Sequence, residues 1–528
     1  MRSAGVPDVP ATGRIAGAAA LIAVLTVASR LAGFARTGVF TWVVGNTDLG
    51  DIYLAANTVP NIIFEIVAGG ALASLVVPLL AGSVEQGDRA AVSATTSALL
   101  TWTVSLLVPL AALVALLAGP VVTLLDPGGS PEQLAAGERM LRVFAPQLPL
   151  YGIGIVLTGV LQAHRRFAWP VIAPLLSSVT VIGAYLLFGA VEGRRAGVAR
   201  VGLAGEMILA VGTTLGVVVL SLCLVIPVRA LGLRPRLTYR FPAQARRDVG
   251  GMALAGAVTV GAQQVAVLVA LRLSSGGPDG TYVEYNLAQT IYLLPWAVLA
   301  VPLATAAYPA LAAARDDRER YRETLAPAAR GILLLSCLGA AALVAVAGPV
   351  ARFFEVPAAE QGIVGFAPGL LGYGMFAVLT RALYARGEPG PAAAATAAGW
   401  GCAVLAAIGL AAGLADERRV LALTLGNSIG MVVLGALLVA VLVRRAGRAA
   451  LAGLSQAALV GVLAGGAAAA AGWLVTRATG TPTDGGAVLQ GMLSGAVVAA
   501  VFVGVAYPLD RHDVRPMMRA ARNAGRRS

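Results

Sequence analysis

The chain carries little charge for its length. Only 12% of its 528 residues are Asp, Glu, Lys or Arg, whereas an ordinary soluble domain has about 25%. Lysine is absent, so all 39 basic residues are arginine. Hydrophobic residues make up 58% of the chain, and the mean hydropathy is +0.81. This composition excludes a soluble globular protein and predicts one that crosses a membrane many times.

Residues that commonly build catalytic or metal sites are also scarce. The two histidines, His164 and His512, are far apart, and Cys223, Cys337 and Cys402 lie in separate apolar runs. This pattern provides neither a metal-ligand cluster nor a disulfide framework. No phosphate-binding glycine loop, nucleophile elbow or zinc-protease motif occurs. We therefore predict no enzymatic activity, no catalytic residue, no metal and no cofactor. The net charge of +13 comes without a basic patch interleaved with aromatic residues, so nucleic acid is not an expected partner.

Apolar segments long enough for the bilayer core recur along the chain. A core of about 30 Å needs about 20 helical residues at 1.5 Å per residue. The expected fold is an all-α polytopic membrane protein with about fourteen transmembrane helices, at residues 14–44, 52–81, 91–119, 138–163, 168–191, 201–228, 248–272, 282–313, 328–349, 361–385, 391–414, 420–443, 450–475 and 486–508.

The arginines outside these spans indicate the orientation. If the N-terminus is cytoplasmic, 27 arginines lie in cytoplasmic segments and ten in outer segments. Cytoplasmic loops are enriched in basic residues, so this distribution predicts a cell-membrane protein with both termini in the cytoplasm. One outer connection, with Arg194, Arg195 and Arg200, runs against the rule. The remaining two arginines, Arg30 and Arg36, lie inside the first span.

The second and eighth spans resemble each other. Both contain an Ala-[Asn/Gln]-Thr core, followed by a proline 20 residues after Thr58 and 19 residues after Thr290. A weaker similarity links the connections after spans four and ten, and the two offsets are about 232 and 222 residues. Six spans per repeat leave the two halves in the same orientation. The sequence therefore predicts two pseudo-twofold-related six-helix lobes around a central cavity, plus two extra helices. The expected units are residues 1–230 (first lobe), 231–446 (second lobe), 447–510 (spans 13 and 14) and 511–528 (a basic cytoplasmic tail).

Charged side chains inside the spans are the best candidates for a functional site, because each is costly in lipid. The first half has Arg30, Arg36 and Glu65 within spans, and Asp51 at the outer mouth of span two. Arg30 is 16 residues beyond Arg14, about 24 Å along a helix, which is far for a side chain to reach the interface. Pairing with Glu65 would neutralise only one arginine. We therefore expect both arginines to face a cavity.

Two arginines in one cavity suit an anionic ligand. The planar guanidinium binds a diphosphate or carboxylate through two parallel hydrogen bonds. Arg30 and Arg36 point about 120° apart on an ideal helix, and Gly33 and Gly38 allow a bend that brings them together. Other polar residues extend the predicted cavity lining and gate. They are Ser29, Asp51, Asn57, Asn61, Glu65, Gln289 and Thr290.

The second half has no comparable charges inside its spans. Gln289, Thr290 and the other polar residues there are neutral. Such residues are equally typical of hydrogen bonds that join membrane helices, and we favour that interpretation for the second half. The first half is therefore expected to bind the anionic group.

The segments "SRLAGFARTGVF" and "DIYLAANTVPNIIFEIVAGGALASLVVPLLAG" resemble the start of the MurJ/MviN family of lipid II flippases. This family belongs to the multidrug/oligosaccharidyl-lipid/polysaccharide exporter superfamily. The "RRFAWPVIAP" connection and the fourteen spans also fit. The resemblance implies export of undecaprenyl-diphosphate-linked peptidoglycan precursor by alternating access, with Arg30 and Arg36 among the residues that bind the diphosphate. Asp51 matches an aspartate of the family. The implied partners are the lipid-linked glycan, membrane lipids and the cell-wall synthesis machinery, and the transporter is expected to be a monomer.

Several positions differ from the family pattern. Many members have arginines where this chain has Phe64 and Glu65, a further arginine at the position of Thr290, and an aspartate at that of Thr37. The resemblance therefore leaves three alternatives open. They are a paralogous exporter of another polyprenyl-diphosphate-linked glycan, a multidrug or cation antiporter of the same superfamily, and a non-transporting scaffold for cell-wall assembly.

Overall fold

The computed structural model describes residues 11–66, 73–233, 236–240, 250–480 and 484–511. These residues form helices joined by short connections and contain no β-strand. The first half has α1 (Ala11–Val43), α2 (Asp48–Ile66), α3 (Ala73–Glu85), α4 (Arg89–Leu116), α5 (Ala118–Leu125), α6 (Pro131–Phe144), α7 (Gln147–Ala163), α8 (Ala168–Glu192), η2 (Val198–Arg200), α9 (Leu203–Leu222) and α10 (Val225–Arg229). The second half has α11 (Gly250–Ser274), α12 (Thr281–Pro295), η4 (Trp296–Ala300), α13 (Val301–Ala313), α14 (Arg318–Phe353), α15 (Pro357–Phe366), α16 (Gly369–Ala385), α17 (Pro389–Gly413), η5 (Asp416–Arg418) and α18 (Arg419–Ala446). After η6 (Arg448–Leu451), α19 (Leu454–Ala478) and α20 (Asp484–Leu509) complete the chain.

The helices confirm the predicted membrane fold. Among the described residues, 11 helices or continuous helix pairs are long and apolar enough to cross a membrane. α15 and α16, bent by 48° to each other, make a twelfth if they are counted as one span. The two remaining expected spans, 14–44 and 52–81, contain residues that the structure does not describe in full. The number of fourteen therefore stays a prediction. The expected basic tail lies outside the described residues after Arg511.

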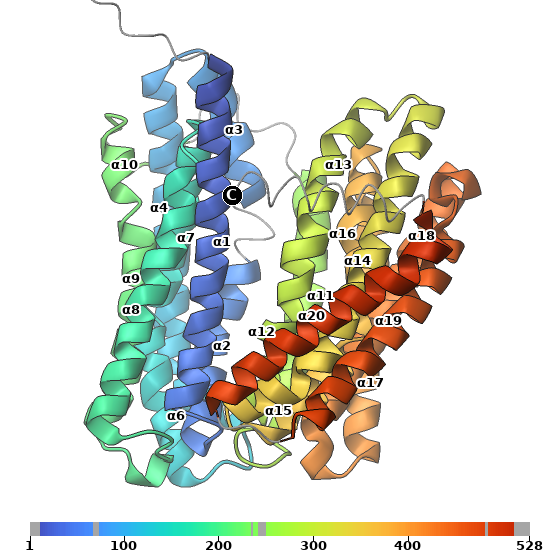
Figure 1. The fold of residues 1–528 in the computed structure, drawn as a ribbon. Coiled ribbons are helices and arrows are strands. Elements are labelled where there is room, and N and C mark those ends of the chain that lie inside the picture. The colour runs from blue at the N-terminus through green and yellow to red at the C-terminus, as the bar shows by residue number, and fades with distance from the viewer. Residues whose placement is uncertain (1–10, 67–72, 234–235, 241–249, 481–483, 512–528) are drawn as a thin grey trace, which may run out of the picture.

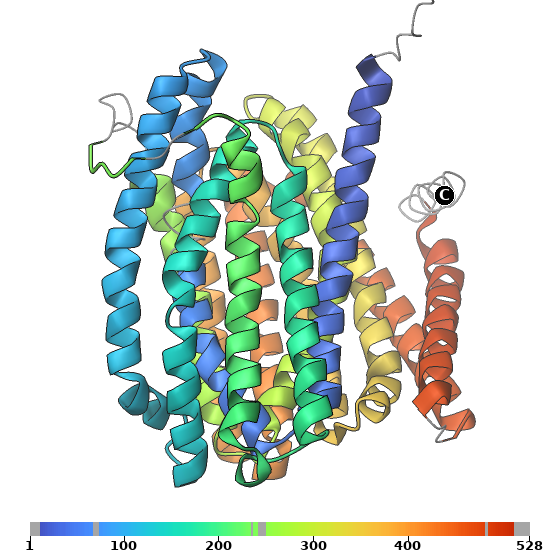
Figure 2. The same cartoon turned by 90° about the vertical axis from the view of Figure 1, so that its left-hand side faces the viewer.

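The helices form two bundles (Figure 1). α1–α10 make one bundle and α11–α18 the other. The two approach each other at the end where α1 is followed by α2, and they diverge toward the end where α3 and α13 lie. α19 and α20 lie on the outside of the second bundle, where they pack on α14. Figure 2 faces the first bundle and shows its long helices side by side, with α20 beyond α1.

Small residues let α19 and α20 lie close to α14. Ala457, Ala464 and Ala468 of α19 have an exposed fraction of 0%. They share one hydrophobic cluster with Cys337 of α14 and Phe502 of α20. Because lipid tails are as apolar as these side chains, close packing rather than escape from water holds such helices together. The last two helices are therefore a packed addition to the outer surface of the second bundle.

The two bundles repeat one arrangement of aromatic residues. The ring of Phe64 on α2 lies 4.4 Å from that of Tyr151 on α7. The ring of Trp296, directly after α12, lies 4.7 Å from that of Tyr373 on α16. Trp296 follows Phe64 by 232 residues and Tyr373 follows Tyr151 by 222, the offsets that the sequence repeat predicts. The halves therefore place equivalent helices against each other in the same way, as expected of two related lobes.

Gly372 sets the closest approach between α16 and α18. A Cβ atom at this position would overlap the Met431 carbonyl oxygen. Because this neighbour is backbone and cannot swing aside, we expect Gly372→Ala to lower the free energy of unfolding by about 3 kcal/mol. The unfolding temperature of the protein in detergent measures the effect. Gly409→Ala on α17 is the matched control, since nothing lies within 4 Å of its Cβ position. Equal unfolding temperatures of the two variants would contradict the prediction.

Candidate functional site

Arg30 and Arg36 lie on α1 with exposed side chains. Neither guanidinium has a hydrogen-bond or ion-pair partner among the described residues. At Gly33, between them, no other part of the described structure lies within 4 Å of the Cβ position. The arginines therefore flank an open face of α1, next to the half-buried Ser29. Glu65 on α2 is exposed too and forms no ion pair with either arginine in the described part of the chain, so it does not neutralise them.

Polar side chains of α2 and α7 lie within electrostatic reach of Arg36. Tyr151 on α7 donates a hydrogen bond to Asn61 Oδ1 at 2.9 Å, and its phenol is near enough to Arg36 and Glu65 to be affected by both charges. Asn57, one turn before Asn61, has a buried side-chain oxygen without a hydrogen-bond partner among the described residues. Since buried polar atoms are nearly always bonded, this oxygen is an acceptor that remains available on α2.

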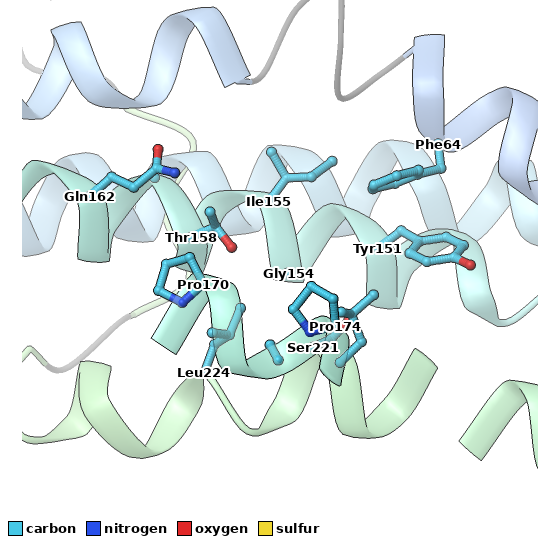
Figure 3. A pocket seen from close by; sticks show the side chains of 13 residues that line it. Phe64, Tyr151, Gly154, Ile155, Thr158, Gln162, Pro170, Pro174, Ser221 and Leu224 are labelled. Atoms are coloured by element: carbon cyan, nitrogen blue, oxygen red, sulfur yellow. The ribbon is translucent and has the colours of Figure 1, made fainter. Parts of the chain in front are cut away.

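A pocket of about 400 Å³ lies beside these residues (Figure 3). It lies between α7, α8 and α9, and most of its walls are apolar. The rings of Phe64 and Tyr151 lie at one end, Gln162 lies at the other, and Pro170 and Pro174 of α8 lie along one wall. Phe64 occupies a position at which the family resemblance predicts an arginine. The first bundle thus has an apolar, aromatic surface at this end of the pocket.

A buried network of hydroxyl groups joins three helices near Arg36. The Tyr53 hydroxyl lies 2.8 Å from that of Tyr185 and 2.5 Å from Thr213 Oγ1, which links α2 to α8 and α9. Phe40 of α1 stacks on Tyr53, with 5.1 Å between the ring centroids. A buried network whose members are all bonded is rigid. This network therefore fixes the part of α1 that carries Arg36, one turn before Phe40.

Gln289 and Thr290 lie at helix contacts of the second bundle. Gln289 lines a small cavity together with Asn427 of α18 and residues of α11 and α17. Thr290 Oγ1 donates to the Asn286 carbonyl oxygen at 2.9 Å within its own helix. The contacts of both residues are those of helix packing.

Asp51 joins the two bundles at the end where they meet. Its carboxylate accepts hydrogen bonds from the backbone N–H of Gly280 at 2.8 Å and from those of Tyr282 and Val283 at 3.0 Å each. These groups form the N-terminus of α12, where unpaired N–H groups and the helix dipole favour a negative charge. A side chain of α2 thus caps a helix of the other bundle, and Asp51 acts as a link between the lobes.

Arg195 makes a second link at the same end, with the opposite charge. It lies between α8 and η2, and its guanidinium donates to the carbonyl oxygens of Phe354 at 2.6 Å and Glu355 at 3.2 Å. Phe354 is the C-cap of α14, where the carbonyl groups carry partial negative charge. The Glu355 carboxylate lies 3.2 Å from the same guanidinium. The connection between α8 and η2, which in the predicted orientation is an exception to the positive-inside rule, therefore contacts the second bundle directly.

Two further polar contacts cross between the bundles. Asn46 Nδ2 donates to Glu284 Oε1 at 2.8 Å, and the hydroxyls of Thr58 and Tyr282 lie 3.2 Å apart. We find no hydrogen bond between the bundles at the opposite end within the described ranges. The polar contacts between the lobes are therefore concentrated at one end of the molecule.

The sequence points directly to Arg30 and Arg36, only indirectly to Arg195, and not at all to Tyr151. Tyr151 gives no signal, because a tyrosine inside an apolar helix is ordinary. Arg195 does give one, since its connection is the exception in the distribution of arginines. Asp51 is identified as a candidate, but its partners are backbone groups 229 to 232 positions away, which no sequence pattern reveals.

The chain is similar to known proteins over most of its length. The sequence profile of the family described as "Lipid II flippase MurJ" matches residues 40–481. A probable lipid II flippase MurJ of Synechocystis sp. is 25% identical over 393 residues, which cover 71% of this chain and 72% of the relative. The lipid II flippase MurJ of Burkholderia cenocepacia is 25% identical over 376 residues, which cover 68% of this chain and 71% of the relative.

Solved structures share the fold. One, described as lipid II flippase MurJ in an inward closed conformation, matches with a TM-score of 0.73 at 17% identity and covers 92% of this chain and 99% of that one. An inward-facing multidrug resistance MATE family transporter of the MOP superfamily matches with a TM-score of 0.60 at 16% identity, covering 87% and 100%. Since the sequence profile spans most of the chain, the protein belongs to the lipid II flippase MurJ family.

Proposed function

We propose that this protein moves lipid II, or a closely related polyprenyl-diphosphate-linked glycan, from the inner to the outer leaflet of the cell membrane. The observation that carries the proposal is the arginine pair on α1. Arg30 and Arg36 flank an open face of the helix and have no carboxylate partner among the described residues. A diphosphate offers each guanidinium a pair of oxygens for two parallel hydrogen bonds. Relatives named lipid II flippases support this class of cargo.

The contacts between the bundles support alternating access as the mechanism. Asp51 and Arg195 hold the lobes together at one end, and the lobes diverge at the other (Figure 1). With both termini in the cytoplasm, as the distribution of arginines favours, the diverging end faces the cytoplasm. The head group enters the proposed central cavity there and binds Arg30 and Arg36. The prenyl tail stays in the lipid along α19 and α20, and rocking of the lobes then exposes the head group outside.

The charge of the site favours this cargo over a cationic drug. A cation next to Arg30 and Arg36 would be repelled by both, whereas an anion is attracted. At the positions of Phe64 and Thr290, the family resemblance predicts arginines that this chain lacks. Because part of the expected basic lining is missing, the proposal names the class of polyprenyl-diphosphate-linked glycans and not lipid II alone. Flipping changes no covalent bond, and we assign no catalytic residue. We propose that the transporter acts as a monomer near the enzymes of cell-wall synthesis.

Complementation and reconstitution test the proposed function. The wild-type chain should rescue a cell depleted of its own lipid II flippase. In liposomes, the purified protein should raise the rate at which lipid II in the inner leaflet becomes accessible to an added enzyme. Failure of both assays, with the protein correctly inserted, would reject lipid II as cargo. Transport of a different polyprenyl-diphosphate-linked glycan in the same liposomes would select the alternative.

A further inference from the structure

Part of the connection between the two bundles is fixed to the surface of α4. Residues 236–240, here called the strap, run along this helix. The backbone N–H groups of Arg236 and Thr238 donate to Ser97 Oγ at 3.0 Å and to Thr101 Oγ1 at 3.1 Å. Each of these hydroxyls also donates to a carbonyl oxygen of α4 itself. The hydroxyl groups therefore serve both the helix and the strap.

Tyr239 completes the attachment. Its carbonyl oxygen accepts a hydrogen bond from Trp102 Nε1 at 3.1 Å, and its hydroxyl lies 2.8 Å from Ser105 Oγ. The rings of Tyr239 and Trp102 are 5.3 Å apart in an edge-on arrangement. The strap thus bonds to α4 along one side. Its other side carries Leu237, whose exposed fraction is 93%.

The strap lies where the lipid-facing stripe of α4 begins. Exposed large apolar residues follow Trp102 at helical spacing, a pattern typical of a face in contact with lipid. They are Leu106, Leu113 and Leu116, with exposed fractions of 66%, 50% and 77%. Extended backbone is not tolerated against lipid inside the hydrocarbon core, because its polar groups need partners. Tryptophan and tyrosine are enriched at membrane–water interfaces. The strap therefore marks the level of the interface on this bundle.

We propose that the strap binds anionic phospholipid head groups, with Leu237 among the upper acyl carbons and Arg236 and Arg240 on the phosphates. Both arginine side chains are exposed and have no hydrogen-bond or ion-pair partner within the described ranges. Basic residues next to a membrane span are attracted to an anionic leaflet. An acidic protein or a nucleic acid would also attract the arginines, but it would not explain a fully exposed leucine beside tryptophan and tyrosine. Which leaflet the strap contacts depends on the orientation proposed above. The proposed contact with lipid does not depend on it.

The depth of Leu237 is the first test. A spin label on Leu237→Cys, in a chain whose Cys223, Cys337 and Cys402 are replaced by serine or alanine, is placed in nanodiscs that contain phosphatidylglycerol. The label should be more accessible to dissolved oxygen than to a water-soluble nickel complex, as at the boundary between head groups and acyl chains. Free access to the nickel complex, as for a residue in water, would overturn the proposal. Transport activity does not enter this measurement, so its result is independent of the cargo.

The second test titrates phosphatidylglycerol into the detergent-solubilised protein and follows the rise in unfolding temperature. Arg236→Gln/Arg240→Gln should need about 25-fold more lipid for half of the rise. Each arginine near an anionic surface contributes about 1 kcal/mol, or roughly fivefold. Arg318→Gln/Arg320→Gln changes the net charge equally at exposed positions of α14 and should respond like the wild type. Equal shifts in both double variants would show a general charge effect and reject the strap as the lipid site.

Discussion

Arg36→Ala should reduce lipid II transport by about 30-fold to 4,000-fold, the largest effect that we expect of any single substitution. Removing one partner of a close charge pair away from bulk water costs about 2–5 kcal/mol, and each 1.4 kcal/mol corresponds to a factor of ten. Arg36 has no alternative partner among the described residues, so its charge is available to the cargo. The rate of lipid II exposure in proteoliposomes measures the effect.

Two variants separate this role from a general loss of charge. Arg36→Lys keeps the charge but loses the planar fork, so its rate should lie between those of the wild type and Arg36→Ala. Arg418→Ala removes an exposed arginine from η5 and should leave the rate unchanged. A wild-type rate for Arg36→Ala, at equal amounts in the membrane, would remove Arg36 from the binding site.

The combination of Arg30→Ala with Arg36→Ala shows whether the two arginines share one anion. The side chains point about 120° apart on an ideal helix, and the open face at Gly33 lies between them. If both bind the same diphosphate, the rise in the activation free energy of transport in the double variant should be smaller than the sum of the rises in the two single variants. Strict additivity would indicate that the arginines contact separate groups of the cargo.

The arginine pair could be predicted from the sequence because its energetic cost is local. A permanent charge deep in an apolar helix is costly whatever the rest of the chain does, so the sequence alone identifies Arg30 and Arg36 as candidates. Both side chains are exposed in the structure, and their role in binding stays a prediction. The repeat of the two halves could also be predicted from the sequence. Phe64 and Trp296 occupy equivalent positions in the two bundles, at the offset that the sequence predicts.

Links between the lobes could not be predicted, because they depend on backbone groups. The acceptor at Asp51 is visible in the sequence, but its donors are the N–H groups at the start of α12, which every helix of any sequence would offer. Arg195 likewise binds carbonyl groups at the end of α14. Which helix end lies opposite which side chain is decided by the packing of whole bundles. The sequence therefore identifies one side chain of a link, such as Asp51, without showing which group it binds.

Asp51→Asn should open the end at which the two lobes meet, which is the outer end in the proposed orientation. This is the second of the two largest effects. Asparagine has the same shape but no charge, so the N-terminus of α12 loses the carboxylate that its dipole and three N–H groups favour. A loss of about 2 kcal/mol, within the range for hydrogen bonds to charged groups, would raise the ratio of outward-open to closed protein about 30-fold. Gly128 lies between α5 and α6 of the first bundle, and Glu417 lies in η5 of the second. Distances between spin labels on Gly128→Cys and Glu417→Cys, in a chain without its native cysteines, report this opening.

Arg195→Gln should shift the same distance distribution in the same direction, since it removes the opposite charge from the C-terminus of α14. Asp316→Asn, which neutralises an exposed carboxylate after α13, should leave it unchanged. The two link variants should also slow transport. A protein whose equilibrium is shifted toward the outward-open state exposes Arg30 and Arg36 to the cytoplasm for a smaller fraction of the time. If Asp51→Asn slows transport while the outer distance stays short, the carboxylate acts on the cargo and not on the gate. The joint measurement of distance and rate therefore decides which role Asp51 has.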